Sequence, residues 1–278
     1  MNSDMDLIAV SPTLEKFQDP QKTADGSDRA VVKLRELNLL WLNTGTLCNL
    51  SCDNCYIEST PSNDRLTYLT RSDVQRFLDE ISALELPVIE IGITGGEPFM
   101  NPDILQILVD CLEAGMKVLV LTNAMRPMMK CADQLLLLNQ RFRDQLVLRV
   151  SLDHYHPDKH EEERGQRSWK PAIKGLRWLC DNRFQVRVAA RTRWESDQDS
   201  LRNGFLQLFK QINLPIDAND PSELILFPEM HDMTDVPEIT TQCWDILNVN
   251  PSDIMCASSR MVVRRKHAPN AEVVSCTL

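Results

Sequence analysis

Three cysteines in the run CNLSCDNC, at Cys48, Cys52 and Cys55, are the residues whose type and spacing most clearly indicate chemistry. Thiolates are the ligands that iron–sulfur clusters select. The C-x3-C-x2-C spacing suits three irons of a four-iron cluster and leaves the fourth iron open to another molecule. A zinc half-site or scattered buried thiols are the alternatives. Zinc requires a fourth Cys or His at similar spacing, and none follows within the next fifty residues.

A second candidate site is the run Gly95-Gly96-Glu97-Pro98. Glycines let the backbone approach a ligand closely, and the Glu97 carboxylate can accept charge-assisted hydrogen bonds from an ammonium group. Taken alone, the run is better explained as a Gly-Gly turn before a helix start.

Both candidate sites directly follow an apolar run that predicts a buried strand, at residues 37–42 (LNLLWL) and 88–94 (VIEIGIT). Sites in barrels and open α/β sheets are built at the carboxyl ends of strands. Further strands are predicted at 117–121, 146–150, 184–191 and 223–227, and helices at 70–84, 101–114, 128–141, 169–182 and 201–212. This alternation predicts parallel βαβ units.

Together, the cysteine triad and the GGEP run resemble the signature of the radical S-adenosylmethionine (SAM) enzymes. The resemblance implies an α/β fold, a partial (β/α)6 TIM-like barrel with a C-terminal extension. It implies that Cys48, Cys52 and Cys55 ligate a [4Fe–4S] cluster, whose open iron takes the amino and carboxylate groups of SAM. Gly95, Gly96, Glu97 and Pro98 would lie at the SAM ammonium. Family members usually carry an aromatic residue between the second and third cysteines. Here that position is Asn54, and Tyr56 is the candidate to supply the ring.

The chemistry implied by the resemblance is one-electron cleavage of SAM to methionine and a 5′-deoxyadenosyl radical, which removes a hydrogen atom from a substrate. The electron would come from a donor such as flavodoxin or ferredoxin. A peptide or protein side chain is the favoured substrate, by similarity to peptide-modifying maturases. A small-metabolite enzyme and a non-catalytic iron–sulfur protein are the alternatives.

A third match covers residues 151–165, SLDHYHPDKHEEERG. By resemblance to the maturases, Ser151 would contact the ribose or carboxylate of SAM, and Arg164 would pair with the carboxylate, which its planar guanidinium fits. His160-Glu161 fits a His-acid pair of the family, and Thr122-Asn123 resembles a segment that lines the cofactor side of the barrel. Arg191, near the end of a predicted strand, either faces the cofactor or points outward to solvent.

The segment between Ser151 and Arg164 holds three of the five histidines, His154, His156 and His160, and invites a metal hypothesis. A substrate-facing role for His154 or Asp153 is a second interpretation, because loops at this end of a barrel carry function. The favoured interpretation is an ordered polar loop without chemistry of its own.

The predicted organisation is a flexible segment over residues 1–30, the barrel over 31–228 and an extension over 229–278. Cys243, Cys256 and Cys276 lie in the extension and are candidates for one auxiliary iron–sulfur cluster, with buried or free thiols as the alternative. By the resemblance, the full extension uses about seven cysteines, and this tail does not reproduce their spacing; a chain truncated at its C-terminus is an open alternative. Cys111, Cys131 and Cys180 lie in predicted helices and are expected to lie in the core.

Composition narrows the class of protein. A formal net charge of −10 over 278 residues argues against binding along a nucleic-acid backbone. The sequence has no apolar run of about 18 residues and no basic, apolar signal sequence, so no membrane association is expected. Nine cysteines without a secretory disulfide pattern favour a reducing cytoplasm.

Overall fold

The computed structural model describes residues 15–194, 197–229 and 235–275. The chain divides into two compact units. The barrel unit comprises Glu36–Met230 and Ser258–Leu278, and the small unit comprises Met1–Arg35 and His231–Ala257. The division differs from the predicted one, because Ser258–Leu278 groups with the barrel rather than with a separate extension.

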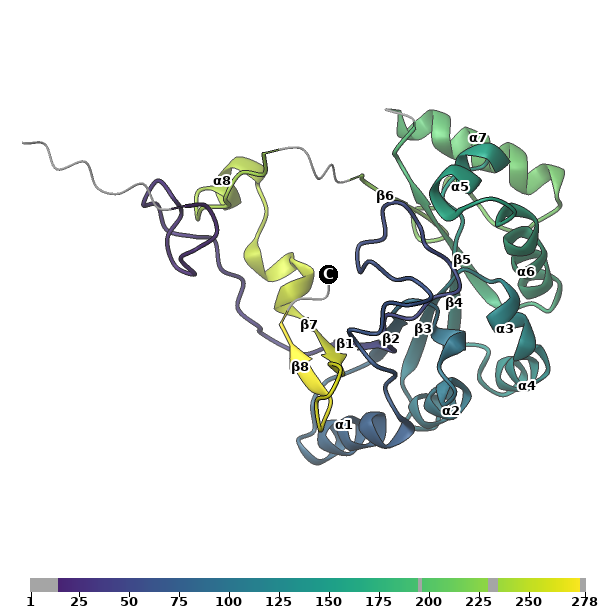
Figure 1. Ribbon diagram of the computed structural model, residues 1–278, viewed down its shortest axis with the longest axis horizontal. Helices are drawn as coiled ribbons and strands as arrows, with labels where there is room; N and C mark the ends of the chain where they lie inside the picture. Colours follow the sequence, from purple (N-terminus) through teal and green to yellow (C-terminus); the bar gives the residue numbers. More distant parts are fainter. Residues whose placement is uncertain (1–14, 195–196, 230–234, 276–278) are drawn as a thin grey trace, which may run out of the picture. The chain divides into compact units, whose positions relative to one another are not determined.

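The barrel unit is built on one eight-stranded sheet in the order β6-β5-β4-β3-β2-β1-β7-β8 (Figure 1). The first six strands follow the chain order and pair in parallel with their neighbours. They are β1 Leu39–Asn43, β2 Glu90–Thr94, β3 Lys117–Thr122, β4 Leu146–Ser151, β5 Gln185–Arg191 and β6 Leu224–Phe227. The sheet is open, since β6 and β8 are its two edges. The predicted α/β partial barrel is confirmed.

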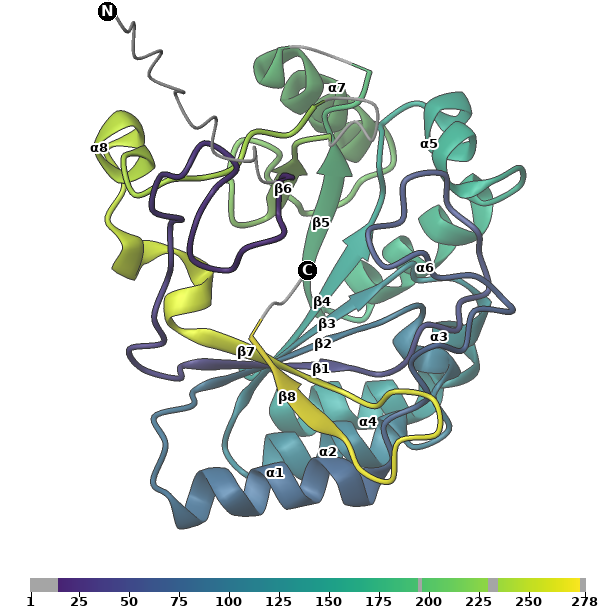
Figure 2. The same cartoon turned by 60° about the vertical axis from the view of Figure 1, so that its left-hand side comes forward.

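Helices connect these strands and cover one face of the sheet (Figure 2). They are α1 Arg71–Ala83, the short 3-10 helix η1 Pro98–Met100, α2 Ile104–Glu113, α3 Arg126–Lys130, α4 Ala132–Phe142, α5 Pro157–Arg164, α6 Trp169–Asp181 and α7 Gln198–Gln211. Alternate strand residues, such as Leu146, Leu148 and Val150 of β4, are fully buried in the core beneath the helices. The residues between them face the other side of the sheet, which we call the inner face.

Local sequence signals explain several helix ends. Thr70 and Asp73 form the predicted capping box at α1, each side chain bonding the backbone N–H of the other. Gly115, with φ +82°, follows the end of α2 in the left-handed conformation that glycine tolerates. Cys111 is buried in the core, and Cys131 and Cys180 lie against its edge, which confirms the expectation for these thiols.

Two expectations about the helices were wrong. The helix predicted over 128–141 is two helices, α3 and α4, separated by a turn in which the Cys131 N–H bonds the Met128 carbonyl. No Gly or Pro marks that break. The segment after Asp153, interpreted as a polar loop, contains the helix α5, with Pro157 at its first turn and Gly165 at its C-terminal cap. Its residues lack an apolar stripe, and so carry no periodic signal.

The C-terminal strands extend the main sheet. β7, Ser259–Val263, pairs in parallel with β1, and β8, Glu272–Val274, pairs antiparallel with β7. Backbone hydrogen bonds also join the residues after β7 to those after the cysteines, from Thr67 N to Arg264 O and from Lys266 N to Arg65 O.

The small unit has its own contacts. The Arg29 guanidinium pairs with Glu238, and the Ala30 N–H donates to the Ile239 carbonyl. It also holds α8, Cys243–Leu247, and two 3-10 turns, η2 Pro251–Asp253 and η3 Met255–Ala257. Residues 15–30, expected to be part of a flexible segment, form turns and bonded contacts here; residues 1–14 lie outside the described residues. Within the described chain, no helix combines the length and apolarity needed to cross a bilayer.

Candidate functional site

The three cysteines lie on one closed loop that leaves the carboxyl end of β1; we call residues 44–60 the cysteine loop. Its start and end are joined by a bridge between Leu47 and Thr60 and by a hydrogen bond from Cys48 N to Thr60 O of 3.1 Å. Cys48 is buried, and Cys52 and Cys55 are half-buried. Backbone N–H groups already point at two sulfurs, Leu50 N to Cys48 Sγ at 3.4 Å and Ser59 N to Cys55 Sγ at 3.3 Å.

The charge state of these thiols depends on what surrounds them. Burial raises the pKa of Cys48 to about 12 and that of Cys52 to about 11, although Arg164 opposes the shift at Cys52. Both are therefore neutral thiols at pH 7, and a metal ion that bound them would have to displace their protons. Besides burial, smaller effects come from the neighbouring thiols, since Cys52 raises the pKa of Cys48 and Cys55 raises that of Cys52.

Three thiols on one closed loop fit a cluster that keeps one iron open. Among the described residues, no three His, Cys, Asp or Glu side chains are gathered closely enough to hold a single metal ion. Ligands of different irons in one cluster stand farther apart than ligands of one ion, so the donor set remains compatible with the cluster.

The glycines of the GGEP run lie directly against the cysteine loop. A methyl group at Gly96 would lie 2.1 Å from the Leu47 carbonyl oxygen and 3.0 Å from Cys48 Cβ. Gly95 adopts φ +134°, and Gly96 N bonds Gly45 O at 2.8 Å. The sequence suggested glycines for close approach of a ligand. The structure shows that they admit the backbone next to Cys48.

Glu97 is buried, with 1% of its surface exposed, and accepts three hydrogen bonds from neutral groups. The donors are Thr122 Oγ1 at 2.8 Å, Asn123 N at 2.9 Å and Phe99 N at 3.2 Å. Burial raises the pKa of Glu97 to about 7, and these bonds limit the rise. Asn123 also donates from Nδ2 to Asn49 Oδ1 at 3.0 Å. The predicted Thr122-Asn123 segment thus joins GGEP to the cysteine loop.

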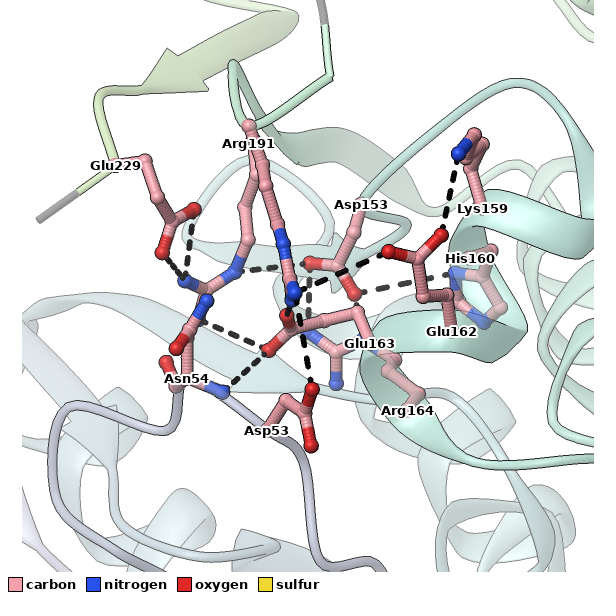
Figure 3. Close-up of polar contacts among 11 residues, drawn as sticks. Asp53, Asn54, Asp153, Lys159, His160, Glu162, Glu163, Arg164, Arg191 and Glu229 are labelled. Atoms are coloured by element: carbon pink, nitrogen blue, oxygen red, sulfur yellow. Dashed lines mark hydrogen bonds and ion pairs between the residues drawn. The ribbon is translucent and has the colours of Figure 1, made fainter. Parts of the chain in front are cut away.

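Charged side chains on α5 and at or just after the ends of β4, β5 and β6 form a second support, which we call the ion-pair cluster (Figure 3). It comprises Asp153, Glu163, Arg164, Arg191, Arg193 and Glu229. Arg164 makes a two-point contact with Asp153, one bond being 3.1 Å from Nη2 to Oδ1. Arg191 lies 3.4 Å from Asp153 through Nε and 3.2 Å from Glu229 through Nη1.

The charges of the ion-pair cluster compensate one another. Burial by itself would raise the pKa of Asp153, but the guanidinium of Arg164, assisted by Arg191, holds that pKa below its usual value. Burial likewise works against the charge of Arg164, and Asp153 reverses the effect and raises the Arg164 pKa. Both groups are therefore charged at neutral pH.

The ion-pair cluster binds the cysteine loop between its second and third cysteines. Glu163 accepts from Asp53 N through its carbonyl oxygen at 2.9 Å and from Asn54 N through Oε1 at 3.0 Å. Arg191 donates from Nη2 to the Asn54 carbonyl at 2.7 Å, and its guanidinium stands 4.9 Å from the centre of the Tyr56 ring. Residues 53–56 are therefore held by α5 and β5 (Figure 3).

The structure places the other predicted SAM contacts at the same end of the sheet. Ser151 is the last residue of β4 and is half-buried. Arg164, expected to pair with the SAM carboxylate, is engaged by Asp153 in the described structure. Tyr56 is 42% exposed and donates from its hydroxyl to the Pro228 carbonyl at 3.1 Å. Arg191 is only 8% exposed, so the outward-facing alternative for this residue was wrong.

Sequence reasoning missed Glu163, Arg193 and Glu229. Arg193 reaches Glu163 Oε2 at 2.9 Å. The sequence does carry a signal for such a cluster, since charged residues of both signs follow β4, β5 and β6. The carboxyl ends of neighbouring parallel strands meet at one edge of a sheet, so these charges are expected to lie close together.

The three histidines of the 151–165 segment have different surroundings. His154 stacks on Tyr155 with ring centres 4.2 Å apart and accepts from His156 N at 2.9 Å. His156 begins α5 at the surface. His160 is fully buried against Trp169, and neither ring nitrogen has a hydrogen bond to a described residue. Burial, aided by Arg164, lowers the pKa of His160 to about 4, so its ring is neutral at pH 7.

The candidate auxiliary ligands lie mainly in the small unit. Cys243 begins α8 and Cys256 lies in η3, both half-buried. Cys276 lies outside the described residues. An auxiliary cluster on these cysteines remains a prediction.

Comparison with known proteins assigns the family. The model of the Radical SAM superfamily matches residues 42–192, which is more than half of the chain. The antilisterial bacteriocin subtilosin biosynthesis protein AlbA of Bacillus subtilis (strain 168) is 32% identical over 144 residues, 51% of this chain and 30% of AlbA. The AdoMet-dependent heme synthase of Methanosarcina barkeri is 28% identical over 149 residues, 52% of this chain and 40% of the synthase. The chain therefore aligns with less than half the length of these relatives.

Solved structures share the fold. Streptococcus suis SuiB bound to S-adenosylmethionine superposes with a TM-score of 0.60 at 14% identity, over 87% of this chain and 60% of SuiB. The enzyme anSMEcpe with bound AdoMet gives a TM-score of 0.53 at 13% identity, over 72% of this chain and 55% of that one.

Proposed function

This chain belongs to the radical SAM superfamily, and from that membership we propose that Cys48, Cys52 and Cys55 hold its [4Fe–4S] cluster and that the chain catalyses radical chemistry on a peptide or protein side chain. Enzymes of this superfamily use a [4Fe–4S] cluster and SAM. When bound and reduced, these two groups supply a 5′-deoxyadenosyl radical that can remove a hydrogen atom from a substrate. An external one-electron donor such as flavodoxin or ferredoxin would provide the electron.

The single observation that carries the proposal is the double support of the cysteine loop. Gly96 lies against the residue before the first cysteine, and Glu163 and Arg191 bind the backbone between the second and third cysteines. Metal ligands that are fixed by such outer contacts bind with defined orientation. A loop of only buried structural thiols would not need both supports.

We assign the cofactor contacts to residues that surround this loop. Gly95, Gly96, Glu97 and Pro98 lie on its first side and are assigned to the SAM ammonium. Ser151 and Arg164 lie at the end of β4 and on α5 and are assigned to the ribose and carboxylate. Asp153 already accepts from one edge of the Arg164 guanidinium. The guanidinium has N–H donors left on its other edge, which a SAM carboxylate would use. Tyr56 is assigned to the adenine.

The names of the similar proteins favour a peptide substrate. AlbA is a bacteriocin biosynthesis protein, and SuiB has been solved with the precursor peptide SuiA. A small-metabolite substrate is the second candidate, favoured by the matches to the heme synthase and to the probable GTP 3′,8-cyclase of Methanococcus vannielii.

The experiment that tests the proposal is anaerobic reconstitution of the full chain with iron and sulfide, followed by dithionite, SAM and an assay for 5′-deoxyadenosine. We expect product from the wild type and from Cys180→Ala, since Cys180 belongs to α6, not to the cysteine loop, and packs against the core. Cys52→Ala should lose both the cluster absorbance and the product. Retained cleavage in Cys52→Ala would refute the ligand assignment.

Two further readouts of the same samples extend the test. Iron and sulfide counts decide between one cluster and two, and so test the role of Cys243, Cys256 and Cys276. Addition of SAM should change the electron paramagnetic resonance of the reduced cluster. Turnover of a free metabolite, with no modified peptide, would favour the second candidate.

A further inference from the structure

Two arginines lie side by side on the inner face of the sheet, Arg149 on β4 and Arg187 on β5. The sheet register pairs Arg149 with Arg187 directly. The neighbours of each arginine along its strand, such as Val150 on β4 and Val188 on β5, are fully buried in the core beneath the helices. Because strand side chains alternate between faces, both arginines face away from the helices.

These two arginines lack a counter-charge. Neither makes an ion pair or a side-chain hydrogen bond with any residue that the structure describes, and Arg149 Nε is buried without a partner. Glu90 and Asp220 are the acids whose charge reaches Arg149 and Arg187, but neither is within ion-pair distance. Like charges on directly paired strand positions destabilise a sheet, and a buried unpaired donor costs free energy.

The other arginines of the site, unlike Arg149 and Arg187, have acidic partners among the described residues. Arg191 and Arg193 at the end of β5 and Arg164 on α5 all pair with carboxylates. Acids are abundant in this chain, with 40 Asp and Glu against 30 Lys and Arg. Two neighbouring arginines left without an acid on an inner sheet face therefore indicate an anion that is supplied from outside the chain.

The position of the pair relative to the proposed cofactor contacts identifies that anion. Arg149 and Ser151 share one face of β4, two residues apart, which corresponds to about 6–7 Å along the strand. An anion bound by the pair would lie below the strand ends where SAM is assigned. A substrate anchored there can present a carbon atom a few bonds away to the cofactor.

We propose that Arg149 and Arg187 bind a carboxylate of the substrate, either an acidic side chain or the C-terminus of a peptide. This proposal rests on the proposed function and names its substrate class as acidic. Two planar guanidinium groups provide paired N–H donors that match a carboxylate in two-point geometry.

The test measures the thermal unfolding of the reconstituted full chain, without oxygen, in the presence of glutarate or its neutral analogue glutaramide. A ligand that binds only the folded state raises the unfolding temperature. We expect glutarate, and not glutaramide, to stabilise the wild type. Arg149→Gln and Arg187→Gln should each weaken glutarate binding on the order of tenfold to a hundredfold, as expected for loss of one charged hydrogen-bond partner. Arg177→Gln, at an exposed position of α6, is the matched control and should bind like the wild type.

A purely structural role gives a different result. Without glutarate, Arg149→Gln and Arg187→Gln should unfold no earlier than the wild type, because each removes a like-charge repulsion. Earlier unfolding together with an unchanged glutarate effect would overturn the proposal. Equal stabilisation by glutarate and glutaramide would overturn it as well.

Two further measurements distinguish a phosphate ligand from a carboxylate, and failure of the proposed function from failure of the arginine-pair proposal. Tripolyphosphate is tested beside glutarate, and stronger stabilisation by tripolyphosphate would replace the carboxylate by a phosphate group and so overturn the acidic-peptide assignment. Formation of 5′-deoxyadenosine by the wild type is measured on the same preparation. Its absence would count against the proposed function, whereas the glutarate result alone decides the arginine pair.

Discussion

Two carboxylates, Glu97 and Asp153, are both buried beside the cysteine loop, yet their pKa values move in opposite directions. Glu97 accepts hydrogen bonds only from neutral groups, and burial raises its pKa to about 7. Asp153 faces Arg164 and Arg191, and its pKa is lowered in spite of burial. Hydrogen bonds from neutral donors therefore do not offset the loss of water around a carboxylate here, whereas nearby guanidinium charges do.

The same contrast separates the two supports of the cysteine loop. On the GGEP side, close backbone packing at Gly96 fixes the loop and involves no full charge. On the other side, buried charges fix residues 53–56 through Glu163 and Arg191. A larger side chain should weaken the support on the GGEP side, and removal of a charge should weaken the support from the ion-pair cluster.

The largest effect on stability is expected from Asp153→Asn. This change leaves Arg164 and Arg191 buried without their shared counter-charge, and breaking a buried ion pair costs about 3–5 kcal/mol. Denaturant unfolding measures the loss. Asp158→Asn is the control, because Asp158 is 89% exposed in its side chain and should change the free energy of unfolding by about 0.5 kcal/mol or less. Equal effects at the two positions would contradict the importance of the ion-pair cluster.

The next largest effect on stability is expected from added side-chain volume at Gly96. In Gly96→Ala the new methyl group meets the Leu47 carbonyl, and overpacking of this kind costs about 1–3 kcal/mol. Because the displaced backbone leads into Cys48, iron content after reconstitution should fall more sharply than stability does. Gly115→Ala introduces strain at φ +82° with no atom within 4 Å of the new methyl group, so it should keep its iron. Full iron loading of Gly96→Ala would show that the contact does not shape the loop.

Glu97 predicts a pH dependence of the free energy of unfolding. Its folded pKa, about 7, lies above the ordinary value of 4.5, so its contribution to stability is present below pH 4.5 and is lost as the pH rises toward 7. Glu97→Gln should remove this loss, which unfolding at a series of pH values from 4.5 to 7 would detect. Asp153 has the opposite sign, because its lowered pKa contributes stability above its ordinary pKa that is lost as the solution becomes more acidic. An identical slope in wild type and Glu97→Gln would rule out titration of this carboxyl as the cause.

The smallest effect on the free energy of unfolding is expected from substitution of Tyr56. Tyr56→Leu removes the ring next to the Arg191 guanidinium, a cation–π contact worth about 0.5–1 kcal/mol at an exposed site. Tyr56→Phe keeps the ring and should lose less, since it gives up only the hydroxyl bond to Pro228. Equal losses in the Phe and Leu variants would show that the hydroxyl bond, and not the ring contact, accounts for the effect.

The sequence by itself predicted the candidate ligand set and determined the order of the elements. Cys48, Cys52 and Cys55 lie within eight residues, so their spacing alone restricts the chemistry, and the alternation of apolar strands and amphipathic helices predicts a parallel sheet. The start of α1 at Thr70 and Asp73 was equally readable, because a capping box is formed between residues three apart. Where the local signal is weak, as at the break between α3 and α4 or in the polar helix α5, the prediction was wrong.

Only the tertiary structure decided which distant residues meet. Glu163 bonds Asn54 across 109 positions of sequence, Arg191 faces inward, and β7 joins β1 instead of forming a separate extension. The pairing of Arg149 with Arg187 depends on the register between β4 and β5. Such contacts are set by how whole strands and helices assemble and by the need to pair buried charges, and neither is written in the spacing of neighbouring residues.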